Sequence, residues 1–252
     1  MVKGLLLVNA LAILVVMSTA FVAAKNRKRL DTVDIAWVLS FVVAASIVAG
    51  YEFTWRTVTI AVLVDVWAIR LSNHLLERAK TRKEDPRYTA IAKKWKGDYW
   101  LNAYMRIFLM QALLAWLVAL PIVLAAGKGN HLSALFILLG ILVWLKGFLI
   151  ETIADRQLAT FLKTNKGIMQ TGLWLYSRHP NYYGEIVQWL GIALIACGAH
   201  NGWLGFIGPL ILIVTIIFIS GIPPIEKAKA NDLEYQKYKR RTSPLIPWFP
   251  KQ

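Results

Sequence analysis

The chain carries the stretch Gly172-Leu-Trp-Leu-Tyr-Ser-Arg-His-Pro-Asn-Tyr-Tyr-Gly-Glu185 directly before an apolar run, residues 186–197. Polar groups at the mouth of a membrane span are costly unless they are paired, so they usually mark a binding or reaction site. Pro180 also fixes the backbone direction where the next helix begins. The stretch therefore predicts a helix that enters the membrane with a site for an anionic ligand at its N-terminus.

The composition indicates a membrane protein. Of the 252 residues, 57% are hydrophobic, which is more than soluble domains of this size usually carry. Windows of about 20 apolar residues are long enough to cross a bilayer as helices. The sequence predicts an all-α, polytopic fold with seven such helices, at residues 4–24, 33–50, 57–76, 104–126, 131–154, 181–199 and 202–223.

The distribution of the net charge of +15 predicts the orientation. Lys and Arg crowd into residues 25–29, 77–100, 155–178 and the tail 224–252, whereas the opposite segments hold only Lys3, Arg56 and Lys128. Because cytoplasmic loops are rich in Lys and Arg, we expect the N-terminus outside and the tail in the cytoplasm. Seven spans satisfy this alternation and six do not. The positive charge thus mainly indicates the topology. We expect the protein to contact membrane lipids and to bind no nucleic acid. In a bacterium, the membrane would be the inner one.

Several sequence features limit the alternatives. The first apolar segment has some marks of a signal peptide, but it is long and is followed at once by basic residues, which favours a retained helix. The lone Cys197 indicates neither a disulfide nor a thiolate metal site, and we expect no metal. No Gly-x-Gly-x-x-Gly, P-loop or His-Glu-x-x-His motif is present. We expect one membrane domain over residues 1–252.

Two pairs of polar side chains recur at helical spacing. Glu151 and Asp155 lie four residues apart, and so do Asn181 and Glu185, which places each pair on one helix face. Two acids side by side at the end of a helix destabilise it, so a cationic or hydrogen-bond-donating group should face Glu151 and Asp155. Carboxylates also accept hydrogen bonds from the ribose of a nucleotide. An internal network with Arg156 or the tail arginines explains the acids equally well.

Basic and aromatic residues form a second set of candidates. Arg70 and His74 share one face of the third predicted span, where Arg70 either snorkels to the interface or pairs inside the bundle. Arg178 and His179 precede the sixth span, and the tail adds basic and aromatic side chains that could close over a phosphate or an adenine ring. A tail that only binds lipid headgroups is the competing interpretation. The tail residues are Tyr235, Tyr238, Lys239 and Arg240.

Together these motifs resemble the steroid 5-alpha-reductase superfamily, in particular its bacterial branch of DUF1295-type membrane proteins. The resemblance rests on residues 150–158, 172–185, 220–226 and 235–250, with Asp34-Ile-Ala-Trp37 and Trp67-Ala-Ile-Arg-Leu71 upstream. It implies a seven-helix reductase that binds NADPH between the cytoplasmic ends of its later helices. The residues that this resemblance and the pattern assign to NADPH are Arg70, His74, Glu151, Asp155, Tyr176, Arg178, His179, Asn181, Tyr182, Glu185, Tyr235, Tyr238, Lys239 and Arg240.

The resemblance also implies a reaction, the reduction of a C=C bond in a lipophilic enone. The cofactor supplies the hydride, and a donor on the protein must polarise the carbonyl. The steroid reductases use a Gln-Glu pair on the second helix and a Tyr on the third. Here the matching positions offer Asp34 and Trp67, which leaves NADPH binding intact and argues against a steroid substrate. Tyr104 or Tyr99 would replace the missing Tyr.

Two other functions fit part of the sequence. Membrane methyltransferases that use S-adenosylmethionine, such as isoprenylcysteine carboxyl methyltransferases, share an Arg-His-Pro-x-Tyr-x-Gly core with this chain. The longer form that runs from Asn181 to Glu185 and the helix with Glu151 and Asp155 favour the reductase. A lipid-binding or scaffold protein that has lost catalysis is a third class. Substrate, stereochemistry and oligomeric state do not follow from the sequence.

Overall fold

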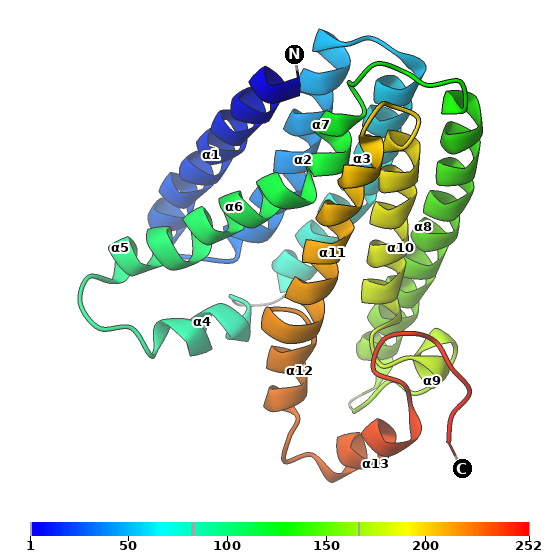
Figure 1. The fold of residues 1–252 in the computed structure, drawn as a ribbon. Helices are drawn as coiled ribbons and strands as arrows, with labels where there is room; N and C mark the ends of the chain where they lie inside the picture. Colours follow the sequence, from blue (N-terminus) through cyan, green and yellow to red (C-terminus); the bar gives the residue numbers. More distant parts are fainter. Residues whose placement is uncertain (1, 82–83, 166, 252) are drawn as a thin grey trace. The chain divides into compact units, whose positions relative to one another are not determined.

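A computed structural model describes residues 2–81, 84–165 and 167–251 (Figure 1). Within these ranges the chain forms helices and no β-strand, with two isolated β-bridges in its loops. It divides into two compact units. Unit 1 comprises Met1–Ile137 and Ala193–Gly208, and unit 2 comprises Leu138–Ile192 and Pro209–Gln252. The helical class predicted from apolar windows is therefore correct.

Unit 1 is built on three long helices, α1 (Val2–Arg27), α2 (Thr32–Tyr51) and α3 (Trp55–Thr81). Helix α2 packs between α1 and α3, and α1 also contacts α6. Ile13, Met17, Phe41 and Phe108 are fully buried in this packing. The remaining elements of the unit are α4 (Pro86–Ala92), α5 (Tyr99–Ala103), η1 (Tyr104–Phe108), α6 (Leu109–Val118), α7 (Leu120–Leu124) and η2 (Gly202–Phe206).

Arg56 ties together the loop at the end of α7. Its guanidinium donates to the carbonyl oxygens of Ala125 (3.2 Å) and Gly127 (2.7 Å) and to the Ser133 hydroxyl (2.9 Å). Carbonyls at a helix end have no partner within the helix, so a buried guanidinium satisfies several of them at once. Arg56 thus has a structural role in unit 1.

Unit 2 is organised by the pairing of α8 (Ser133–Thr164) with α10 (Pro180–Ala196), which run side by side in Figure 1. Glycines allow their backbones to touch. A Cβ atom on Gly147 would lie 2.6 Å from the Gly184 carbonyl oxygen, and one on Gly191 would lie 2.7 Å from that of Gly140. The other elements are α9 (Leu173–Tyr176), α11 (Ile207–Val214), η3 (Thr215–Ile219), α12 (Ile222–Ala228) and α13 (Leu233–Arg241).

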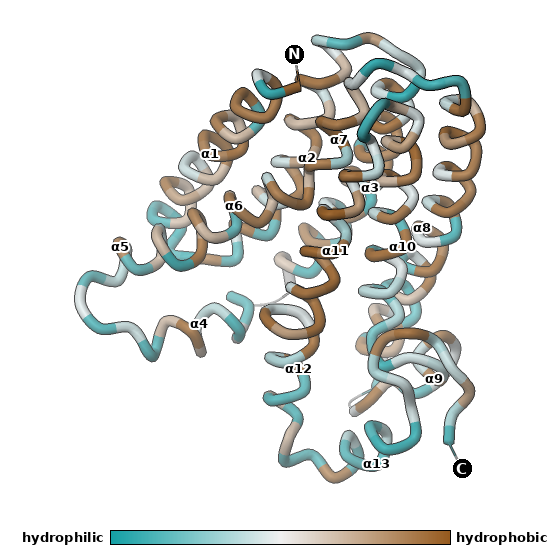
Figure 2. Tube along the Cα trace, viewed as in Figure 1, coloured by the Kyte–Doolittle hydropathy of each residue, from teal (hydrophilic) through white to brown (hydrophobic). Residues whose placement is uncertain are grey.

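The apolar helices bear out a multi-pass membrane protein. Among the described residues six helical segments are long and apolar enough to cross a membrane: Val2–Arg27, Thr32–Tyr51, Trp55–Ala79, Tyr99–Leu124, Ser133–Thr164 and Gly202–Ala228. The predicted span that is missing from this set, the sixth (residues 181–199), corresponds to α10, which has only 17 residues. In unit 2, Figure 2 shows hydrophobic residues along α8 and α11, whereas hydrophilic ones gather in α12 and α13.

One prediction from the sequence needs correction. Helix α8 continues to Thr164 instead of ending at 154, so Glu151 and Asp155 lie inside the helix and not at its end. Asp31 stands at the N-cap position of α2, but its side chain caps no backbone N–H. It instead pairs with Arg29 at 2.7 Å, because a bidentate ion pair with a guanidinium competes successfully for the carboxylate.

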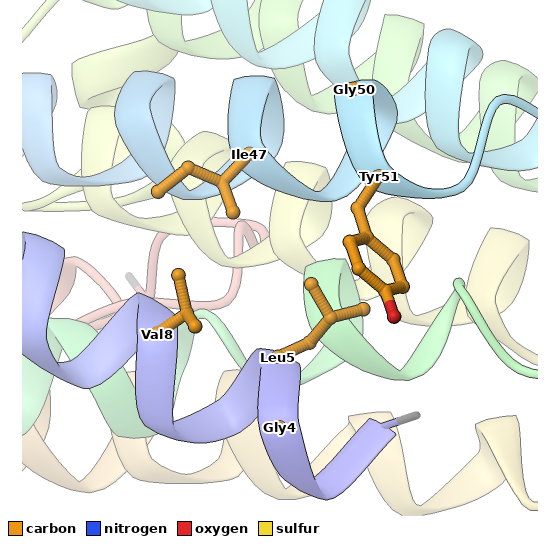
Figure 3. A pocket seen from close by; sticks show the side chains of 6 residues that line it. All are labelled: Gly4, Leu5, Val8, Ile47, Gly50 and Tyr51. Atoms are coloured by element: carbon orange, nitrogen blue, oxygen red, sulfur yellow. The ribbon is translucent and has the colours of Figure 1, made fainter.

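An apolar groove of about 440 Å³ lies between the start of α1 and the end of α2 in unit 1 (Figure 3). Leu5, Val8 and Ile47 give its wall a hydrocarbon surface, and Tyr51 closes one end. Such a lining suits an acyl chain, and the Tyr51 hydroxyl is the one polar side-chain group among the six lining residues. The groove therefore takes no part in the site described below.

Candidate functional site

The two acids of α8 are paired with amide side chains of α10. The Gln188 side chain donates to a Glu151 carboxylate oxygen at 2.5 Å, and the Asn181 side chain donates to Asp155 at 3.2 Å. Glu151 and Asp155 are buried. The expectation that hydrogen-bond donors face these acids is thus met by amides. The two contacts are possible because the glycines described above bring α8 and α10 within reach of short side chains.

Glu185 extends this polar face along α10. It follows Asn181 by four residues and is half-buried, so the two side chains lie on one face of the helix. Gln188 follows three residues later and reaches Glu151. Unit 2 therefore presents a continuous strip of amides and carboxylates, the groups that recognise hydroxyls and carboxamides.

A cluster of charged groups lies just before α10. The Arg178 guanidinium is 2.8 Å from a Glu226 carboxylate oxygen, and the Lys239 ammonium is 2.6 Å from the other oxygen. His179 Nε2 lies 3.9 Å from the same carboxylate. The side chain of Arg178 is only 6% exposed, so this ion pair is largely withdrawn from water. We call Arg178, His179, Glu226, Tyr235 and Lys239 the charged cluster.

The chain after α13 holds the cluster in position through backbone contacts. The Arg178 N–H donates to the Ser243 carbonyl at 2.9 Å, and the His179 N–H donates to the Ser177 hydroxyl at 3.1 Å. That hydroxyl in turn donates to the Leu245 carbonyl at 2.7 Å. Arg178 and His179 are therefore fixed by a segment more than 60 residues away in the sequence.

Four buried polar atoms of the cluster make no hydrogen bond to any residue in the described ranges: Glu226 Oε1, which is ion-paired with Arg178, and three that can donate, Arg178 Nε, His179 Nε2 and the Tyr235 hydroxyl. The residues of the three donors are 7%, 4% and 3% exposed. Buried polar atoms normally have a partner, so a group of unsatisfied ones indicates a place for a ligand or water. Arginine, histidine and tyrosine can all donate, which suits phosphate oxygens.

Burial sets the protonation of the cluster. It lowers the pKa of His179 to about 4, against the opposing attraction of Glu226, so the imidazole is neutral at pH 7. It also raises the pKa of Tyr235 to about 12, with the negative charge of Glu226 acting in the same direction. The permanent positive charges of the cluster are therefore those of Arg178 and Lys239.

The remaining predicted residues of unit 2 have other surroundings. The Tyr238 hydroxyl donates to the Trp174 carbonyl, so it fastens α13 to α9. The Tyr182 ring stacks on His179 with 5.6 Å between centroids. Tyr176 packs its ring edge-to-face against Phe249, and Arg240 is exposed on α13.

Five predicted residues belong to unit 1. The Tyr88 hydroxyl donates to Asp34 at 2.5 Å, and the Arg87 guanidinium lies 3.7 Å from the same carboxylate. Trp67 is buried, with its ring 5.9 Å from that of Phe41. Two further residues, Arg70 and His74, are half-buried on α3.

Tyr104, the fifth, contacts α1. It opens the π-helical segment η1, and its hydroxyl lies 2.9 Å from that of Ser18. Its ring packs 4.8 Å from that of Phe21. Asp34 and Tyr104 thus have separate sets of partners within unit 1.

Three residues of these networks were not among the sequence predictions. Glu226 is the acid that joins Arg178 to Lys239. The sequence feature that could have pointed to it is that it is a single carboxylate next to several lysines after α11. Gln188 had the helical spacing of a site residue but no assigned partner. Tyr88 lies on the short helix α4, and nothing in the sequence connects it to Asp34, 54 residues earlier.

Comparison with known proteins gives one family and two relatives. The family model described as "Protein of unknown function (DUF1295)" matches residues 20–242. Uncharacterized protein C594.04c of Schizosaccharomyces pombe is 26% identical over 195 residues, 63% of this chain and 56% of the relative. 3-Oxo-5-alpha-steroid 4-dehydrogenase 1 of Macaca fascicularis is 30% identical over 119 residues, 44% of this chain and 41% of the relative. The chain thus spans about half the length of these relatives, and no solved structure matches it.

Proposed function

This chain belongs to the family described as protein of unknown function DUF1295, and we propose that it is a membrane-embedded reductase that uses NADPH to reduce a C=C bond in a lipophilic enone. The observation that carries the proposal is the adjacency of the charged cluster, just before α10, and the strip of amides and carboxylates along α10. The similarity to a protein named 3-oxo-5-alpha-steroid 4-dehydrogenase 1 supports the reaction class.

The donors and acceptors of unit 2 fit the chemistry of a dinucleotide. Arg178 Nε, His179 Nε2 and the Tyr235 hydroxyl are buried without hydrogen-bond partners among the described residues, and they would hold phosphate oxygens. Asp155, Asn181 and Glu185 would bind hydroxyl and carboxamide groups, because carboxylates accept and amides both donate and accept. The dipole of α10 adds to the attraction for an anion at this end.

NADPH, when bound, supplies the hydride. The protein's part is to fix the orientation of both reactants and to exclude water, and burial of the charged cluster favours this because electrostatic interactions are stronger away from solvent. Lys239, whose side chain is 43% exposed and pairs with Glu226, would contribute a positive charge at the edge of the cluster.

The substrate side of the proposal rests on unit 1. Asp34, at the start of α2, would have to be protonated to donate a hydrogen bond to the enone carbonyl. The Tyr88 hydroxyl, which donates to Asp34 in this structure, is the neighbouring group that could donate in its place. Trp67, where the steroid reductases carry a Tyr, favours a substrate other than a steroid. Apolar surfaces of the helices would admit such a substrate laterally from the bilayer.

The proposed topology retains seven crossings, with α10 as the short one. A helix of 17 residues is about 26 Å long, close to the thickness of the hydrocarbon core. The N-terminus would lie outside and α13 in the cytoplasm, where NADPH is available. Cysteine accessibility in sealed vesicles would test this arrangement.

Cofactor binding by purified protein in nanodiscs tests the function directly. NADPH should bind more tightly than NADH, and Asn181→Ala and Glu185→Gln should each weaken NADPH binding at least tenfold without changing the unfolding temperature. Asn165→Ala is the matched control, because Asn165 lies exposed at the end of α8 and bonds only to its neighbours. Absence of binding by both nucleotides, together with thermal stabilisation by S-adenosylmethionine, would overturn the proposal in favour of a methyltransferase.

A further inference from the structure

The last residues of the chain display apolar side chains to the surroundings. Ile246, Trp248 and Phe249 are 64%, 71% and 77% exposed. A soluble surface seldom exposes a Trp and a Phe side by side, so these side chains call for a partner. We call residues 245–250 the C-terminal strap.

The strap is held firmly and is not a loose tail. The Trp248 N–H donates to the Tyr176 carbonyl at 3.0 Å, and the Leu245 carbonyl accepts from the Ser177 hydroxyl at 2.7 Å. At its end the Lys251 N–H donates to the Arg241 carbonyl at 2.8 Å. The exposed side chains are therefore presented at a fixed place beside α9, which Figure 1 shows next to the C-terminal segment.

That place is level with the end of the apolar part of α8. The Trp174 indole of α9 donates to the Ala154 carbonyl at 3.1 Å, and the Leu173 N–H donates to the Gln157 side chain at 3.0 Å. A hydrocarbon core about 30 Å thick takes roughly 20 helical residues, and counting from Ser133 this ends near residue 153. On the exposed side of α8, Ile153 is followed by Arg156, and one earlier cation, Lys146, is also exposed two turns before Ile153.

The residue types of the C-terminal strap and its level along α8 both indicate the interfacial layer of the bilayer. Trp and other aromatic side chains favour the level of the headgroups, and two exposed neighbours on α9, Leu175 and Tyr176, continue the apolar surface. Exposed cations accompany it and would meet the phosphates of anionic lipids. These cations are Arg156, Arg240, Arg241 and Lys251.

We propose that the C-terminal strap is a membrane anchor: Ile246, Trp248 and Phe249 lie in the headgroup and upper acyl layer, and the neighbouring cations bind anionic phospholipids. This inference depends on the membrane insertion of α8 and not on the proposed reductase activity. Because Ser243 and Leu245 hold the backbone of Arg178 and the side chain of Ser177, the anchor also fixes the charged cluster relative to the bilayer.

An environment-sensitive label tests the anchor in the intact protein. Cys197, the only cysteine of the chain, is replaced by Ala, and Phe249→Cys is labelled with the fluorophore NBD in nanodiscs of phosphatidylcholine with and without phosphatidylglycerol. We expect blue-shifted emission that is quenched by doxyl groups on the lipid chains and resists aqueous iodide. Phosphatidylglycerol should increase the doxyl quenching.

The control is Asn231→Cys with the same label, since Asn231 is exposed in the polar turn between α12 and α13. It should show water-like emission and quenching by iodide. The anchor is refuted if the label at position 249 behaves like the one at 231. Equal doxyl quenching at position 249 in both lipid mixtures would refute the claim that the neighbouring cations bind anionic phospholipids.

Discussion

Arg178 and Glu226, on segments separated by 47 residues, form an ion pair of 2.8 Å whose two side chains are 6% and 13% exposed. Glu226 also binds Lys239 at 2.6 Å, so one carboxylate pairs with two cations from different parts of unit 2. A charge buried this far is tolerated only while its partner stays. Predictions for the cluster follow from this dependence.

Glu226→Gln should lower the free energy of unfolding by about 3 kcal/mol, because it leaves the buried Arg178 guanidinium without a counter-charge. Reversible denaturation in mixed micelles would measure the loss. Glu234→Gln is the control, since Glu234 is exposed and only receives a hydrogen bond from Gln170. If both variants are equally stable, the ion pair contributes no stability.

His179 should make stability depend on pH. Its pKa is about 4 in the folded protein and near 6.5 in the unfolded chain, so the unfolded state binds more protons between these values. Stability is complete above about pH 6.5 and falls as the pH is lowered to 4, by up to about 3 kcal/mol from this group. Thermal unfolding midpoints over this range should show a steeper decline for the wild type than for His179→Gln. Parallel curves would contradict the assignment.

Gly147→Ala should destabilise the protein by about 1–3 kcal/mol, because the new methyl group would lie 2.6 Å from backbone atoms of Gly184 and Gln188 and would push α8 from α10. The same exchange at Gly50, where no atom lies within 4 Å, should be neutral or stabilise α2 by up to about 1 kcal/mol. Denaturant titration of both variants checks the difference. Because α8 and α10 also carry Asp155 and Asn181, Gly147→Ala should weaken NADPH binding as well.

Asp34 and Tyr88 should be energetically coupled. Tyr88→Phe removes the donor of the 2.5 Å hydrogen bond and should cost about 1–3 kcal/mol, since it leaves the carboxylate with one partner fewer. In a double-mutant cycle with Asp34→Asn, the second substitution should cost clearly less in the background of the first. Additive losses would show that the two residues act independently.

The sequence by itself predicted the helical class and most span positions, and it contained the motif of the candidate site. These follow from local rules: apolar runs of the bilayer's thickness, and helical spacing that places Asn181 beside Glu185. It also predicted that donors face Glu151 and Asp155. What it did not give was the identity of those donors, because a pairing between two helices depends on how closely they approach. Glycines at 147 and 184 set that approach.

In the charged cluster, too, the sequence determines some features and the tertiary structure determines the others. The motif placed Arg178 and His179 next to each other before a helix, and this adjacency is covalent, so the sequence alone determines it. That Glu226 and Tyr235 join them, and that Ser243 holds the Arg178 backbone, was decided only when residues 222–245 folded back onto α9. Burial, ion pairing and unsatisfied hydrogen-bond donors depend on which distant segments exclude water, and only the tertiary structure determines that.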